Sequence, residues 1–188
     1  MNTSQPQQPV SPPAQDSEAA GAGPQRVVLA IGLPGSGKST WFRRHGITPL
    51  SSDELRILLA DDVNEQRYQT QIFETMRHLL SVRLAIGRPA TYIDATNIVR
   101  EQRKPFVELA QQRQCRLEAI FFDVPLEVCL ARNGGRGRQV PEDVMRRMAE
   151  ALEPPTAEEG FSRIVRVTPE GGGGESFAEA DSPKREAS

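Results

Sequence analysis

Nine residues, from Gly32 to Thr40, bring together the groups that bind a phosphate chain. Glycines let successive backbone N–H groups turn inward around an anion, and a helix beginning near Lys38 would aim its positive end at it. The stretch follows an apolar, β-prone run, 27–31, so strand, motif and helix come in the order such a loop requires. The alternative is a glycine-rich turn with a chance lysine. We therefore expect a nucleoside triphosphate, with Lys38 on its β- and γ-phosphates and Ser39 on Mg²⁺, in a loop made of Gly32, Gly35, Ser36, Gly37, Lys38, Ser39 and Thr40.

Asp53 and Arg56 lie three residues apart at the start of a predicted helix, 53–59, with Ser52 as its cap. This spacing puts them on one face of the helix, and the short strand predicted before them (49–51) brings that face to the phosphate-binding end of the sheet. A carboxylate there can accept the proton of an attacking hydroxyl, and the guanidinium can hold a phosphate or the reacting γ-phosphoryl group. The pair equally suits an i,i+3 ion pair in an acidic first turn. Their spacing leaves both interpretations open.

A second polar cluster, Asp94-Ala95-Thr96-Asn97, follows an apolar strand. Asp94 could contact a metal-bound water or orient Arg56, and it could equally cap the backbone at the strand end. Thr96 and Asn97 are predicted to form hydrogen bonds on the acceptor side. All three are candidates for substrate binding.

Residues 132–138 form a cationic, glycine-rich segment between two predicted helices, Arg132-Asn133-Gly134-Gly135-Arg136-Gly137-Arg138. This composition is typical of a lid over a triphosphate. Arginines that close over the transferring phosphoryl group stabilise the charge that builds up on it, which makes Arg132 and Arg136 catalytic candidates. A solvated Arg/Gly turn is the alternative.

Strands and helices alternate along the chain, which predicts an α/β fold with a parallel sheet covered on both faces. Ligands bind such sheets at the carboxyl ends of the strands. The expected strands are 27–31, 49–51, 90–93, 117–122 and 163–167, and the expected helices are 38–44, 53–59, 65–86, 100–113, 126–132 and 141–152.

The 188 residues suit one domain, which we place at 26–168. Segments 1–25 and 169–188 are poor in bulky apolar residues, so we expect disordered tails. No window approaches the run of about twenty apolar residues that a membrane span needs, and no secretion signal is evident. A cytoplasmic protein without membrane contact is expected.

The domain carries 21 basic and 18 acidic residues, too mild an excess to coat DNA. Nineteen of its cations are arginines. Arginine is the better bidentate ligand of phosphate, but a bias in nucleotide composition explains the excess equally well, because most of these arginines are predicted to scatter over helix surfaces. His45 and His78 receive no role. Cys115 and Cys129 are predicted to be reduced core residues.

Four blocks together resemble the P-loop kinase module of polynucleotide 5'-hydroxyl kinases, especially that of bacterial RNA-repair kinase-phosphatases. The resemblance covers about 26–168, with the blocks in order. They are Gly32-Leu33-Pro34-Gly35-Ser36-Gly37-Lys38-Ser39-Thr40, Ser51-Ser52-Asp53-Glu54-Leu55-Arg56, Asp94-Ala95-Thr96-Asn97, and Phe122-Asp123-Val124-Pro125 running into Arg132-Asn133, Arg136 and Gln139-Val140-Pro141.

The resemblance implies a role for each matching residue. Lys38 and Ser39 become the ligands of the triphosphate and of Mg²⁺, and Asp53 becomes the general base. Arg56 becomes the arginine of the acceptor phosphate and the transition state. Arg132 and Arg136 become lid arginines.

Three functions follow as hypotheses. The first is an ATP-dependent kinase that phosphorylates the 5'-hydroxyl end of RNA or DNA. The second is a kinase of the same fold that acts on a small hydroxyl compound such as a sugar, nucleoside or antibiotic. The third is a nucleotide-dependent switch ATPase. Asp53 and Arg56 argue against it, because they would have no purpose in such a protein. No obligatory protein partner is evident.

Overall fold

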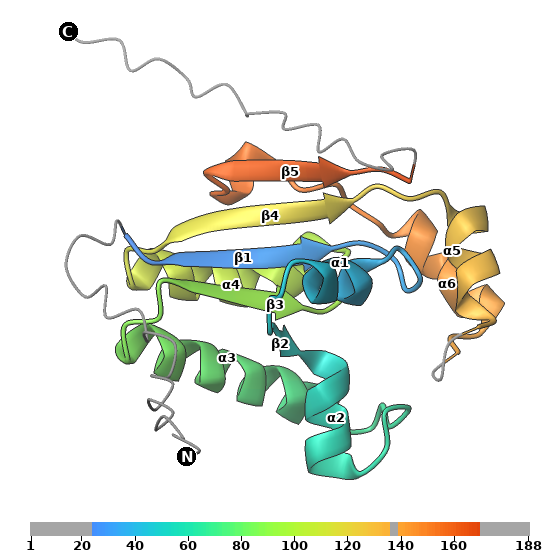
Figure 1. Cartoon of the computed structure of the whole chain (residues 1–188), viewed down its shortest axis with the longest axis horizontal. Coiled ribbons are helices and arrows are strands. Elements are labelled where there is room, and N and C mark those ends of the chain that lie inside the picture. The colour runs from blue at the N-terminus through green and yellow to red at the C-terminus, as the bar shows by residue number, and fades with distance from the viewer. Residues whose placement is uncertain (1–23, 136–138, 170–188) are drawn as a thin grey trace, which may run out of the picture.

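The computed structural model describes residues 24–135 and 139–169. Its centre is a five-stranded parallel sheet with the order β2-β3-β1-β4-β5 (Figure 1). The α/β class and the parallel sheet are confirmed. The strands are β1 (Arg26–Ile31), β2 (Leu50–Ser51), β3 (Ala90–Asp94), β4 (Arg116–Phe122) and β5 (Arg163–Val167).

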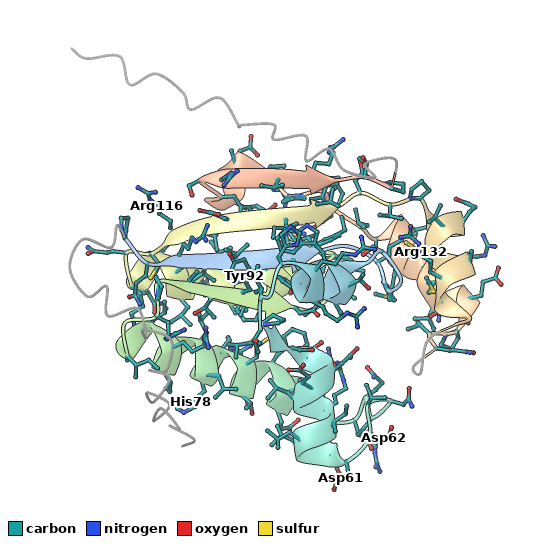
Figure 2. All side chains as sticks on the ribbon, in the orientation of Figure 1. Asp61, Asp62, His78, Tyr92, Arg116 and Arg132 are labelled. Atoms are coloured by element: carbon teal, nitrogen blue, oxygen red, sulfur yellow. The ribbon has the colours of Figure 1, made fainter. Side chains whose placement is uncertain are left out.

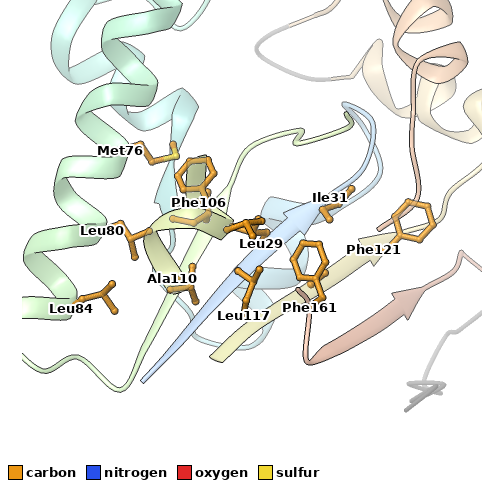
Figure 3. Packing of buried hydrophobic residues seen from close by; sticks show 14 of the residues in the cluster. Leu29, Ile31, Met76, Leu80, Leu84, Phe106, Ala110, Leu117, Phe121 and Phe161 are labelled. Carbon is orange, nitrogen blue, oxygen red and sulfur yellow. The ribbon is translucent and has the colours of Figure 1, made fainter. Parts of the chain in front are cut away.

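Helices cover both faces of the sheet, and β1 contributes to the core on each face. Val27, Leu29 and Ile31 pack with side chains of α3 and α4 (Figure 3), whereas Val28 and Ala30 pack with side chains of α1, α5 and α6. A strand buried on both faces reads as a continuous apolar run, as this one does. The helices are α1 (Lys38–Arg44), α2 (Ser52–Ala60), α3 (Gln69–Ala85), α4 (Arg100–Gln112), α5 (Leu126–Asn133), α6 (Glu142–Glu150) and the 3₁₀ turn η1 (Ala157–Glu159).

The predicted cap of α2 was wrong by one residue. Ser51, not Ser52, is the N-cap, and its hydroxyl accepts a hydrogen bond from the backbone N–H of Glu54 at 3.4 Å. Ser51 therefore ends β2 and caps α2 at once. No residues separate the strand from the helix, which holds the first turn of α2 tightly at the sheet edge.

The long helix predicted from residue 65 begins only at Gln69. Glu65 instead closes a turn, because its carboxylate accepts hydrogen bonds from both the backbone and the side chain of Arg67. The hydrogen bond from the Arg67 side chain is the main cause that lowers the pKa of Glu65 to about 2. Local side-chain bonds of this kind compete with helix formation.

Parts of the predicted domain organisation lie outside the described residues: the tails, apart from residues 24, 25 and 169, and Arg136. Gln25 was assigned to the first tail, yet its side-chain amide donates to the carbonyl oxygens of Leu84 and Arg88 at 3.1 and 2.8 Å. Gln25 therefore contacts the end of α3 and the turn after it. None of the helices that the structure describes is both long and apolar enough to span a membrane.

The loop between β1 and α1 packs so tightly that two of its glycines have no room for a side chain. A Cβ on Gly32 would lie 2.9 Å from the Cβ of Phe122 in β4. A Cβ on Gly35 would lie 2.5 Å from the carbonyl oxygen of Cys129 in α5, and Gly35 has a φ of +82°. The loop is therefore held between a strand and a helix that come much later in the chain.

Replacing Gly35 with Ala should destabilise the protein more than the same change at Gly87. Gly87 also has a positive φ, +77°, but no atom lies within 4 Å of its added Cβ. Gly87→Ala should cost about 1–2 kcal/mol of backbone strain. Gly35→Ala should cost roughly a further 1–3 kcal/mol through overpacking. Urea unfolding of both variants checks this, and equal losses would contradict the packing described here.

Candidate active site

One cavity of about 1790 Å³ lies at the carboxyl ends of the strands. The loop after β1, the start of α2, the segment after β3 and the end of β5 all contribute to its lining. Gly32 and Asn97 are predicted site residues outside the lining, and Arg136 lies outside the described residues. The cavity brings together the predicted residues Gly35, Ser36, Gly37, Lys38, Ser39, Thr40, Asp53, Arg56, Asp94, Thr96 and Arg132.

Lys38 folds back over the loop that precedes it. Its ammonium group donates to the carbonyl oxygens of Gly32 and Leu33 at 2.8 and 2.7 Å, and it lies 3.3 Å from the hydroxyl of Ser36. The side chain is buried. A buried ammonium needs such partners. They hold it inside the concavity of the loop, where an incoming phosphate could take their place.

Ser39 and Asp94 join the loop to β3. The Ser39 hydroxyl donates to Oδ2 of Asp94 at 2.9 Å. Both oxygens are ligands that Mg²⁺ favours. Among the described residues, no group of three or more His, Cys, Asp or Glu side chains forms a metal cluster. A cation here would therefore share these oxygens with phosphate and water, which is how Mg²⁺ binds in nucleotide sites.

Asp53 and Arg56 form the predicted i,i+3 ion pair, and both line the cavity. Their Oδ1 and Nη1 atoms lie 3.0 Å apart. The side chain of Arg56 is 4% exposed, whereas that of Asp53 is 38% exposed. Nη2 of Arg56 also donates to the side-chain oxygen of Gln69 at the start of α3. The guanidinium is thus held between two helices, and the carboxylate is the accessible member of the pair.

Thr96 and Asn97 differ from each other in position. Thr96 lines the cavity, and its carbonyl oxygen accepts from the N–H of Gly32 at 3.0 Å. Asn97 is 1% exposed, and its side-chain amide donates to the carbonyl oxygen of Ala30 at 2.9 Å. Its side chain ties the segment after β3 to β1, so the structure does not bring Asn97 to the acceptor side.

The predicted lid segment leaves α5 beside the phosphate-binding loop. Arg132 lies on α5 (Figure 2), and its Nη1 is 3.9 Å from where a Cβ on Gly37 would be. Asn133 closes the base of the segment, because its amide both donates to the carbonyl of Val140 at 2.8 Å and accepts from its N–H at 3.1 Å. Sequence reasoning missed this role of Asn133. An asparagine beside several glycines gave no sign that its side chain would form hydrogen bonds with Val140, seven positions later.

The part of the cavity near β4, β5 and α6 is largely apolar. Its lining includes Trp41, whose ring meets that of Phe122 edge-to-face at 6.3 Å. Apolar and aromatic walls with few polar groups suit a flat ring system. This wall was not predictable from sequence, because its members come from four separate elements and one connecting segment: Trp41, Phe122, Val124, Val144, Met148 and Val167.

His45 and the two cysteines, which have no assigned role, have structural contacts, whereas His78 is exposed on α3. His45 stacks on Trp41 with ring centroids 3.9 Å apart. Both cysteines are free; Cys129 is buried and Cys115 only half-buried, so the prediction of a core position holds fully for Cys129 alone. Burial raises the pKa of both thiols. A raised pKa keeps a thiol protonated and unreactive near neutral pH.

A parallel sheet with this loop between β1 and α1 is typical of P-loop nucleotide-binding domains. Residues 27–155 match the AAA_33 family, described as an AAA domain, and the chain belongs to it.

Three curated relatives show how the domain is used elsewhere. The chain is 32% identical to the Arabidopsis thaliana transcription factor bHLH140 over 75% of its own length and 16% of that protein's. It is 24% identical to an L-seryl-tRNA(Sec) kinase of Methanococcus maripaludis, over 69% of this chain and 53% of that protein. It is also 24% identical to a bifunctional polynucleotide phosphatase/kinase of Schizosaccharomyces pombe, over 76% of this chain and 33% of that protein. The chain thus spans about half or less of the length of these relatives.

Solved structures share the fold. In the Pnkp1/Rnl/Hen1 RNA repair complex, a chain with 21% identity superposes with a TM-score of 0.59, over 73% of this chain and 47% of that one. A gluconokinase from Sinorhizobium meliloti, 22% identical, superposes with a TM-score of 0.50 over 77% of this chain and 82% of that one. The predicted resemblance to polynucleotide kinase modules is confirmed at the level of family and fold.

Removing the Asn133 side chain should loosen the base of the lid segment. Asn133→Ala loses two hydrogen bonds to Val140 and should lower the free energy of unfolding by about 1–3 kcal/mol. We also expect trypsin to cleave between residues 132 and 139 severalfold faster. Gln139→Ala is the control, because it removes one exposed hydrogen bond to Gly134. Equal cleavage rates in the two variants would show that Asn133 does not hold the segment.

Proposed function

We propose that this chain transfers the γ-phosphoryl group of ATP to a hydroxyl acceptor. One observation carries the proposal: a single cavity is lined on one side by Lys38 and Ser39 and on another by the Asp53–Arg56 pair. A triphosphate-binding loop alone would fit a switch ATPase. An accessible carboxylate held beside a buried arginine supplies what an attacking hydroxyl needs.

On the donor side, the loop amides and Lys38 would bind the phosphates of ATP. Lys38 would exchange the carbonyl oxygens of Gly32 and Leu33 for β- and γ-phosphate oxygens. Ser39 and Asp94 would hold Mg²⁺, which when bound neutralises charge on the phosphates. Arg132 of the lid would stabilise the charge that develops on the transferring group, and we extend this role to Arg136 from the sequence. The loop residues are Gly32, Gly35, Ser36, Gly37, Lys38, Ser39 and Thr40.

On the acceptor side, Asp53 would act as the general base. The acceptor oxygen attacks the γ-phosphorus, its proton passes to the Asp53 carboxylate, and the bond from the γ-phosphorus to the bridging oxygen of ADP breaks. Arg56 would bind an acceptor phosphate and the transferring group in the transition state. Thr96 would orient the acceptor. Most of the rate would come from positioning and charge stabilisation.

We propose the 5'-hydroxyl end of RNA or DNA as the acceptor. Support comes from the four sequence blocks and from relatives named for polynucleotide and tRNA substrates. Arg56 offers a buried guanidinium beside the base, which suits a backbone phosphate near the reacting end.

A small hydroxyl compound is the second candidate acceptor. The acceptor side of the cavity is lined by neutral amides, and amides bind hydroxyl groups without requiring charge. A gluconokinase is among the structures with this fold. The amides come from the turn before α3, from α3 itself and from α4: Asn64, Gln66, Gln69 and Gln102.

Asp53→Asn should abolish acceptor phosphorylation and leave ATP binding intact. The amide keeps the size of the carboxylate and one oxygen near Arg56, but it cannot take up a proton. We expect the turnover rate to fall by about 10²–10⁴-fold, measured with labelled ATP, while the Kd of ATP changes little. Glu54→Gln is the matched control, because Glu54 is exposed on the same turn and does not line the cavity. Normal turnover by Asp53→Asn would remove Asp53 as the base.

Arg56→Ala separates the two acceptor classes. If the acceptor is a nucleic acid, the variant should bind oligonucleotides more weakly, and the salt dependence of binding should fall by about one phosphate contact. A small uncharged acceptor should show little salt dependence. Arg67→Ala is the control, because Arg67 is 78% exposed and does not line the cavity. Wild-type protein that phosphorylates a small hydroxyl compound but no oligonucleotide of any length would favour the second candidate.

A further inference from the structure

Arg103 of α4 is among the largest fully buried side chains of the described residues, although most arginines were predicted on helix surfaces. Its Nε and Nη2 donate to the two carboxylate oxygens of Glu159 at 2.7 and 2.8 Å. Its Nη1 lies 3.0, 3.2 and 3.0 Å from the carbonyl oxygens of Asn97, Ile98 and Glu153. One guanidinium therefore connects residues 97 and 98, just before its own helix, to Glu153 and Glu159, which come 50 and 56 residues after it.

These contacts fasten the segment after β3 to the segment after α6. The carbonyl of Ile98 also accepts from the N–H of Glu153 at 2.8 Å, and the N–H of Arg100 donates to the Glu153 carboxylate at 2.6 Å. Glu159 in turn closes a capping box with Thr156. The Glu159 carboxylate is thus held by its own turn as well as by the guanidinium.

The same segments reach the active-site cavity. The carbonyl of Thr96, one residue before Asn97, accepts from the N–H of Gly32, and the Asn97 side chain donates to Ala30. On the other side, Val144 and Met148 of α6 line the cavity. Arg103 therefore joins the segment after β3, which carries Thr96, to the segment that follows α6, and α6 contributes Val144 and Met148 to the apolar wall.

We propose that Arg103 is a positioning residue for phosphoryl transfer. It fixes the segment after β3 against the segment after α6, and so holds Asp94 and Thr96 in place relative to the phosphate-binding loop. The proposal rests on the proposed function, since it assigns Arg103 to the geometry of the same cavity. Arg103 does not line the cavity, so it would act through the residues that it positions.

The chemistry of the site explains why an arginine is needed. A guanidinium is planar, always charged and offers five N–H donors, whereas an ammonium offers three from one point. Only the planar group can bind Glu159 through two parallel bonds and still reach carbonyls on its other edge. Leaving one member of a buried ion pair alone is costly, so the contacts are strongly coupled.

The test compares Arg103→Lys with Arg100→Lys. Arg100 is the matched control, because it lies on the same helix and approaches the same Glu159 carboxylate at 3.9 Å, but its side chain is 50% exposed. For Arg103→Lys we expect the kcat of transfer from ATP to fall about tenfold, while the Kd of ATP stays within about twofold. Hydrogen exchange of the peptide 94–99 should be faster than in wild type. Arg100→Lys should change neither.

Glu159→Gln provides a second variant should Arg103→Lys fail to fold. An amide keeps one acceptor for the guanidinium and loses the other. We therefore expect the kcat to fall about threefold and the hydrogen exchange of 94–99 to be faster than in wild type. A lowered Tm with unchanged kcat and unchanged exchange of 94–99 would show a merely structural role and overturn the proposal. Hydrogen exchange needs no acceptor, so a wild-type protein without transfer activity would refute the proposed function while leaving the Arg103 contacts testable.

Discussion

The close packing of the phosphate-binding loop is the constraint on which the rest of the site depends. Gly32 lies against Phe122 of β4, and Gly35 lies against the backbone of Cys129 in α5, so the folded loop is packed between two elements that come much later in the chain. That shape in turn provides the carbonyl oxygens that hold Lys38. The site is therefore a product of the whole fold, although its motif is local in sequence.

The strand order explains how the two halves of the site come together. Because β3 lies next to β1, Asp94 at its end meets Ser39 at the start of α1. Because β2 lies next to β3, with Ser51 paired to Asp94, the Asp53–Arg56 turn begins beside the same edge. The phosphate-binding loop and the Asp53–Arg56 pair thus meet at the ends of three adjacent strands, where the proposed transfer would bring its two substrates together.

Local patterns predicted much of this from sequence. The apolar run before Gly32 and the order of strand, motif and helix were enough for the loop, and the i,i+3 spacing was enough for the Asp53–Arg56 pair. Features that depend on contacts between distant segments were not predictable. A buried Arg103 reads like any surface arginine, because its partner Glu159 comes 56 residues later. Asn97 likewise reads as a site residue, and only the fold shows that its amide faces Ala30.

The proposed function requires that the phosphoryl group passes to a hydroxyl and not to water. The most direct measurement follows the γ-phosphorus label of ATP during turnover with 5'-hydroxyl oligonucleotides and small hydroxyl compounds, and divides it between acceptor and inorganic phosphate. We expect most of the label to appear on an acceptor hydroxyl. Label recovered only as inorganic phosphate, whatever acceptor is offered, would contradict it and indicate a nucleotide hydrolase.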